Sequence, residues 1–168
     1  MKRILFITAI CILMVATLVQ AHEGESDFNK FLGIDTQGLS QEETISVQKH
    51  AVMDNLEKVG NKANEELANL PGLAKIIVGK TNINIYFEGE DVIGVQVQDG
   101  KITTIQYGTI EDVTFNVYIS DNVFISLEDN TFDLKQALSN KDITFKGVGF
   151  VGKMKYGMVK AVLAIIGS

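Results

Sequence analysis

Hydrophobic residues recur at helical spacing through the first half of the chain. From Ser40 to Leu70, apolar positions follow one another at steps of three, four or seven, with charged and amide residues between them. Ser40 and Glu43 match the capping box that begins a helix. Pro71 and Gly72 end it, because the residue before a proline is driven out of the helical region. The pattern predicts one long amphipathic helix over this range.

The pattern then changes to an alternation of apolar and polar residues, which is typical of half-buried strands. The alternating segments cover the ranges 83–87, 93–98, 102–107 and 113–119. Between the second and the third, Asp99 and Gly100 are a strong signal for a type I′ hairpin turn. Consecutive segments of this kind predict a four-stranded meander with one apolar face, which helices must cover.

Two short helices are predicted after these strands. Ser120 and Asp121 can cap a helix that runs to Leu127, and either Thr131 or Asp133 can cap a second one. Helices that follow a run of strands indicate an α+β domain rather than alternating βαβ units.

The chain ends with a fifth strand from Ile143 and a glycine-spaced helix. Met154, Met158 and Val162 recur on one face of this predicted helix. Leaving such side chains in water would cost roughly 1.5–3 kcal/mol each. The helix therefore needs a cover, which can be its own sheet, an apolar ligand, a partner or a membrane.

The amino-terminal segment has the pattern of a secretory signal peptide. Lys2 and Arg3 precede the uncharged run Ile4–Val19, and small residues occupy the cleavage-determining positions up to Ala21. We expect cleavage after residue 21 and a secreted or extracytoplasmic protein. The alternative is an uncleaved segment that anchors the protein in a membrane.

Composition narrows the range of partners. The formal net charge is −6, and loss of Lys2 and Arg3 would make it more negative, which argues against nucleic acid as a partner. Cleavage would also remove Cys11, the single cysteine, and with it any disulfide or thiol chemistry. Residues 22–39 are predicted to be a flexible leader, although Phe28 and Leu32 could dock one helical turn on the domain.

Catalytic, metal and cofactor motifs are not found in the chain. It lacks the motifs of serine hydrolases, zinc proteases and phosphate-binding loops, and the glycines from Gly147 onward lack the βαβ unit of a dinucleotide site. His22 and His50 are too few for a convincing copper site. Acidic turns around Glu88 and Glu128 are most simply solvated, with weak calcium binding as the alternative. We therefore expect no enzyme, no cofactor and no metal.

From Leu70 to Ile166 the order of elements resembles the sterol carrier protein 2 (SCP2) lipid-binding domain. The resemblance covers the strand pair around Asp99 and Gly100, the segment Gly108–Phe115, two short helices, and the segment Lys141–Gly147 before an apolar helix that carries methionines. The domain is assigned to residues 71–168. The export signal and the preceding helix of residues 40–70 depart from the usual pattern of the family.

The resemblance implies a five-stranded, largely antiparallel sheet with helices packed on one face and an apolar tunnel between them. It implies a non-enzymatic carrier of a fatty acyl, sterol or isoprenoid lipid, with the carboxy-terminal helix closing the tunnel. The residues that it places along the tunnel are Phe115, Val117, Phe124, Leu127, Phe145, Met154, Met158 and Val162.

A filled core requires the same residue types as a tunnel, so the alternating pattern alone does not separate the two. The alternative function is a structural or homo-oligomeric module with this fold and no ligand. In that case the terminal helix can mediate a homodimer, or it can contact a membrane transiently.

Overall fold

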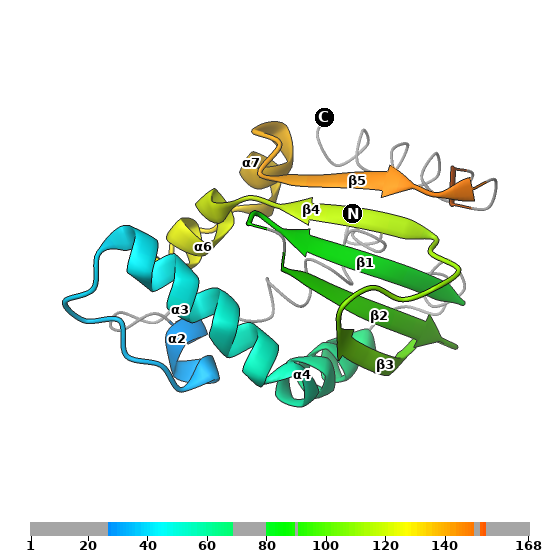
Figure 1. Ribbon diagram of the computed structural model, residues 1–168, viewed down its shortest axis with the longest axis horizontal. Coiled ribbons are helices and arrows are strands. Elements are labelled where there is room, and N and C mark those ends of the chain that lie inside the picture. The colour runs from blue at the N-terminus through cyan, green and yellow to red at the C-terminus, as the bar shows by residue number, and fades with distance from the viewer. Residues whose placement is uncertain (1–26, 69–79, 90, 150–151, 154–168) are drawn as a thin grey trace.

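The computed structural model describes residues 27–68, 80–89, 91–149 and 152–153 (Figure 1). The predicted signal peptide, the turn at Pro71 and the terminal helix with Met154, Met158 and Val162 lie outside these ranges. The described residues form an α+β domain built on one sheet. Its strands are β1 (Thr81–Phe87), β2 (Val92–Gln98), β3 (Lys101–Tyr107), β4 (Phe115–Ile119) and β5 (Ile143–Gly147).

The sheet is mixed and has the strand order β3-β2-β1-β4-β5. β1 and β4 are parallel, and the other neighbouring pairs are antiparallel. The five-stranded, largely antiparallel sheet is therefore as expected. The predicted turn is confirmed, because Asp99 and Gly100 both have positive φ, 52° and 74°, as a type I′ hairpin requires.

The predicted meander is wrong at one connection. β4 does not pair with β3 but lies parallel to β1 on its other side. The connection from β3 to β4, residues 108–114, therefore passes over β2 and β1 (Figure 1). Gly94 lies beneath this connection, where an added Cβ would be 3.0 Å from both the Gly108 oxygen and the Ile110 nitrogen. The connection therefore runs in backbone contact with the sheet.

Two asparagines of β1 hold this connection in place. Asn84 Oδ1 accepts the Ile110 N–H at 2.8 Å, and Asn82 Nδ2 donates to the Glu111 carbonyl at 2.9 Å. Both asparagine side chains are buried, although they lie on the polar face of their strand. β1 is therefore covered on both faces, by apolar contacts on one and by satisfied amides on the other.

Where one long helix was predicted, the structure has two, which is a correction. These are α3 (Gln41–Asp54) and α4 (Leu56–Ala68), with Asn55 between them outside helical geometry. The capping box of α3 is confirmed, with Ser40 and Glu43 bonded to each other in both directions. After the break, α4 turns onto β3, where Asn64 bonds both the N–H and the carbonyl of Ile102.

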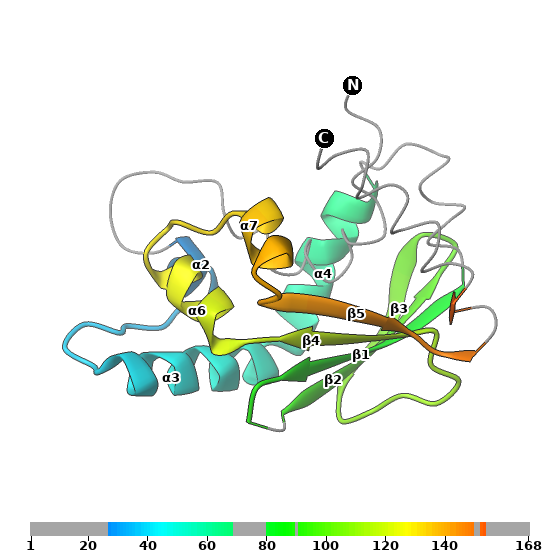
Figure 2. The same ribbon diagram turned by 90° about the horizontal axis from the view of Figure 1, so that it is seen from above.

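Three shorter helices complete the described domain: α2 (Asp27–Leu32), α6 (Asp121–Glu128) and α7 (Leu134–Ser139). Asp133 caps α7 by accepting the Gln136 N–H at 2.7 Å. Part of the expected leader is thus folded, because α2 buries Phe28 and Leu32 in the core. Among the described elements, α4 approaches β3 and α7 approaches β5, whereas no helix comes as close to β1, β2 or β4 (Figure 2).

Candidate functional site

The inner face of β4 brings together three of the residues proposed to line a tunnel. Phe115 and Val117 lie on this strand at 3% and 0% exposure. Val117 is directly opposite Ile85 of β1 and Phe145 of β5. Phe145 is only half-buried. These side chains form a continuous apolar surface across three neighbouring strands, since paired residues of adjacent strands point to the same face.

The apolar surface continues toward the β5 edge through side chains that are only half-buried. Leu134 and Leu138 of α7 are i, i+4 on one helix face, and both pack against the core without being fully covered. Because α7 lies beside β5, these leucines and Phe145 border the apolar interior on that side. An apolar ligand would find its most accessible contacts here.

Phe124 and Leu127 have a different place from Phe115 and Val117. They lie on α6, where Phe124 packs against Phe87 with ring centroids 5.5 Å apart and against Phe28 with centroids 6.3 Å apart. The Lys49 ammonium is 5.8 Å from the Phe124 ring centroid. Phe124 is therefore part of a packed aromatic cluster that α2 closes, and that space is already filled.

A buried polar network joins α2, α3 and α6, and sequence reasoning missed it. The Glu128 carboxylate accepts from Asn29 Nδ2 at 2.6 Å, from Gln48 Nε2 at 2.7 Å and from the Thr36 hydroxyl at 2.7 Å. Glu128 is thus not a solvated turn residue, as its acidic surroundings suggested. Its partners lie 80 to 99 positions away for the two amides, so no local pattern could reveal them.

Lys49 of α3 is a buried cation that links two further segments. Its ammonium pairs with Asp121 at the start of α6 and donates to the Glu88 carbonyl in the turn after β1. The Glu88 carboxylate in turn accepts the Asp121 N–H at 3.0 Å. These bonds satisfy a charge that burial would otherwise make costly, which indicates a structural role.

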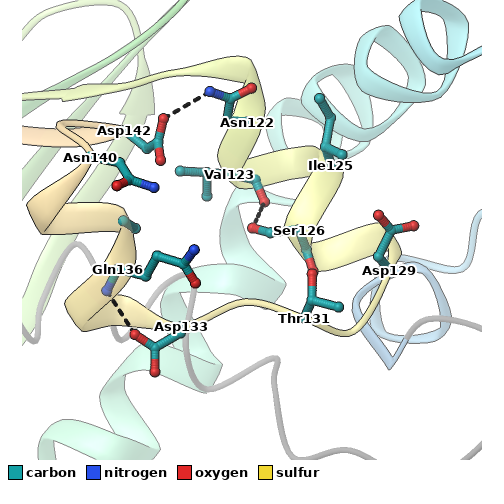
Figure 3. A pocket seen from close by; sticks show the side chains of 11 residues that line it. Asn122, Val123, Ile125, Ser126, Asp129, Thr131, Asp133, Gln136, Asn140 and Asp142 are labelled. Carbon is teal, nitrogen blue, oxygen red and sulfur yellow. Dashed lines mark hydrogen bonds between the residues drawn. The ribbon is translucent and has the colours of Figure 1, made fainter.

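A polar pocket of about 390 Å³ lies between α6 and α7 (Figure 3). Its floor is apolar and includes Val123 and Ala137, which both belong to the hydrophobic core. Its walls carry hydroxyl, amide and carboxylate side chains, and none of its lining residues is Lys, Arg or His. These are Asn122, Ser126, Asp129, Gln136, Asn140 and Asp142, among others.

A second hollow of about 460 Å³ lies between Phe31 and the exposed side of α4. Neither hollow is lined by any of the eight residues expected along a tunnel. Within the described residues there is no group of three or more His, Cys, Asp or Glu side chains placed to hold a metal. The helices found in those residues are too short or too polar to cross a membrane.

Comparison with known proteins finds similarity at the level of structure. No family model and no curated protein matches the sequence. The UbiJ-SCP2 ubiquinone synthesis protein aligns with a TM-score of 0.43 at 13% identity, over 68% of this chain and 97% of that one. Sterol carrier protein 2-like 2 from Aedes aegypti aligns with a TM-score of 0.42 at 15% identity, over 68% and 98%.

An enzyme is also among the similar structures. A double mutant of the sec-alkyl sulfatase PisA1 aligns with a TM-score of 0.35 at 11% identity. The alignment covers 86% of this chain but only 32% of the sulfatase.

Proposed function

We propose that this protein binds a lipid by its hydrocarbon part against the inner face of β4 and β5, without catalysing a reaction on it. The observation that carries the proposal is the spacing of the helices. α4 and α7 approach the sheet at its two edges and α6 packs against the Phe87 end of β1, whereas no described helix approaches β4 or the middle of β1 as closely. The inner face of these two strands is nevertheless apolar from Ile83 to Phe87 and from Phe115 to Ile119.

An apolar chain is the ligand that such a surface favours. Ile85, Val117 and Phe145 offer no hydrogen-bonding groups, so the surface would gain little from a polar guest. Each methylene buried there contributes about 0.8 kcal/mol before the cost of ordering the chain. Ten methylenes would contribute on the order of 8 kcal/mol by the same measure, enough to offset much of the entropy lost on binding.

We further propose that the protein is exported and that its carboxy-terminal helix closes the ligand site. Both rest on sequence: the basic start and apolar run of residues 1–21, and the apolar face with Met154, Met158 and Val162. Amino-terminal sequencing of the exported protein should begin at His22. An intact Met1 in the exported fraction would contradict cleavage and favour the anchored alternative.

Two matched substitutions test whether the interior over β4 has room for a ligand. Val117 and Val95 are both fully buried valines on the inner face. Val95 is paired with Ile105, which α4 covers so closely that a Cβ on Gly60 would lie 3.2 Å from it. We expect Val95→Phe to cost about 1–3 kcal/mol by overpacking. Val117→Phe should cost less than that and should abolish lipid uptake.

The measurement is native mass spectrometry of the detergent-free protein, with extraction of any bound lipid and titration with a fluorescent fatty acid. A co-purifying lipid in the parent protein that Val117→Phe excludes supports the proposal. If both variants are equally destabilised and the parent binds nothing, the interior is a filled core. The protein is then a structural or homo-oligomeric module.

A further inference from the structure

We propose that the polar pocket between α6 and α7 receives the head of the bound lipid and selects heads that donate hydrogen bonds and carry no negative charge. This inference rests on the proposed function, since it names the class of lipid that the same site would take. The pocket is large enough for a small head, with a volume of about 390 Å³. Its position and its charge are the two observations that support the assignment.

The position of the pocket connects it with the apolar interior. Val123 and Ala137 form part of its floor and are buried in the core at the same time. Asp142 lies on its wall, and the next residue, Ile143, begins β5 on the inner face of the sheet. A head bound near Asp142 would therefore lie at the start of β5, and we place its hydrocarbon chain along that strand, toward Phe145.

Asp142 and Asp133 each accept hydrogen bonds through one carboxylate oxygen, and their other oxygen can still accept. Asp142 Oδ1 accepts from Asn122 Nδ2 at 2.9 Å and from the Ser120 hydroxyl at 3.1 Å. Asp133 Oδ1 caps α7. Within the described residues, the second oxygen of the Asp133 and Asp142 carboxylates and the whole Asp129 carboxylate have no such bond, so these acceptors are available to a ligand.

The amides and hydroxyls of the walls extend this preference to uncharged heads. Figure 3 shows Gln136 and Asn140 reaching from α7 toward α6, opposite Ser126. Side-chain amides and hydroxyls both donate and accept, so they can bond to the hydroxyls of a glycerol-like head. The site therefore suits an ammonium or a polyol.

An anionic head fits poorly in the same place. A carboxylate or phosphate would share the pocket with Asp129, Asp133 and Asp142, and the lining has no Lys, Arg or His to compensate its charge. Like charges placed close together repel each other, which makes such a site an effective means of discrimination. A free fatty acid should therefore bind less tightly than a neutral or cationic amphiphile with an identical chain.

The test compares three ligands that share one hydrocarbon chain: palmitic acid, monopalmitoylglycerol and hexadecylamine. Their affinities for the purified protein are measured by displacement of a fluorescent apolar probe at neutral pH. We expect palmitic acid to bind about tenfold more weakly than the other two, which corresponds to about 1.4 kcal/mol.

The variant Gln136→Lys places a cation in the pocket and should bring the affinity for palmitic acid level with that for monopalmitoylglycerol. Gln98→Lys is the matched control, because Gln98 is exposed at the hairpin end of β2, outside the pocket. The control should preserve the ranking of the parent protein. Both glutamines are exposed, so neither change should disturb folding.

The outcomes separate the two proposals. If none of the three ligands displaces the probe, the proposed lipid-binding function fails and the selection of the head fails with it. If all three bind equally, or if palmitic acid binds best, the role of the pocket is overturned while lipid binding stands. If Gln136→Lys and Gln98→Lys change the ranking in the same way, the role of the pocket is also overturned.

Discussion

Glu128 offers the sharpest test of how the amino-terminal segment is held on the domain. Its carboxylate is the shared acceptor for Asn29 and Thr36 on one side and for Gln48 of α3 on the other. Gln48 is completely buried, so its Nε2 donor cannot turn to solvent when it loses the Glu128 acceptor. Removing the carboxylate should therefore destabilise α2 and α3 together.

The magnitude follows from the hydrogen bonds that each substitution leaves. In Glu128→Gln the amide oxygen can still accept from Asn29 and Gln48, while its NH₂ donates to Thr36, whose hydroxyl also accepts. The bonds remain but their acceptor is no longer charged, which weakens each by about 1 kcal/mol. The free energy of unfolding should therefore fall by about 2–3 kcal/mol. Glu128→Ala leaves one N–H of each buried amide without its acceptor, while Asn29 still donates to Thr36 and Gln48 to Asn29. This variant should cost about 3–5 kcal/mol.

Urea unfolding measures these differences in free energy as shifts of the unfolding midpoint, with the slope of free energy against urea concentration equal in all variants. Hydrogen exchange should in addition show faster opening of residues 28–39 in Glu128→Ala. The neighbouring Asp129→Asn is the control, since Asp129 is exposed and should change stability by less than about 0.5 kcal/mol. If Glu128→Ala behaves like the control, the carboxylate is solvated and the reasoning is refuted.

Three further predictions concern other features of the described domain. Gly94→Ala should cost about 1–3 kcal/mol in thermal or urea unfolding, because the connection that crosses β2 would have to move away. Gly152→Ala should cost at least as much, since its Cβ would lie 2.2 Å from the Thr114 carbonyl oxygen. The pKa of Glu43 is lowered by its bond with the Ser40 side chain, so this contribution to stability should disappear as pH falls through the folded-state pKa. An NMR titration of Ser40→Ala should show the pKa of Glu43 raised toward its ordinary value but not fully restored, because the backbone N–H of residue 40 still donates to the carboxylate.

The predictions for Gly152 and Glu43 each have a control. Gly149 has φ of +65° with no atom within 4 Å of an added Cβ, and Asn tolerates this conformation. Gly149→Asn should therefore be much milder than Gly152→Ala, and equal effects would mean that steric contact is not the cause. Asp35→Asn is the control for the Glu43 prediction, because the exposed Asp35 carboxylate does not take part in the capping box. A Glu43 pKa that stays low in Ser40→Ala would contradict the assigned cause.

Local sequence patterns determined most of the elements of this protein. The strand ranges, the hairpin at Asp99 and Gly100, and the capping box at Ser40 depend on residues at most three positions apart. Alternation, turn conformation and capping are decided by neighbours along the chain, so they can be predicted without knowledge of the fold. The placement of Phe115, Val117 and Phe145 on one inner face followed from the same alternation.

The tertiary structure alone decided how these elements meet. Crossing of the sheet by residues 108–114 depends on the amides of Asn82 and Asn84, which a strand pattern counts only as polar and outward. The break at Asn55 appears because one part of the predicted helix packs toward α6 and the other against β3. The periodicity of an amphipathic stripe does not show how many different elements pack against it.

The candidate site divides along the same line. The sequence identified apolar residues that suit either a core or a ligand. Only packing assigned Phe124 to an aromatic cluster and Val117 to the inner face between β1 and β5. The polar pocket and the Glu128 network join groups from separate segments. Their chemistry arises from three-dimensional proximity, because the burial and partners of a polar side chain are properties of the folded chain rather than of its neighbours in sequence.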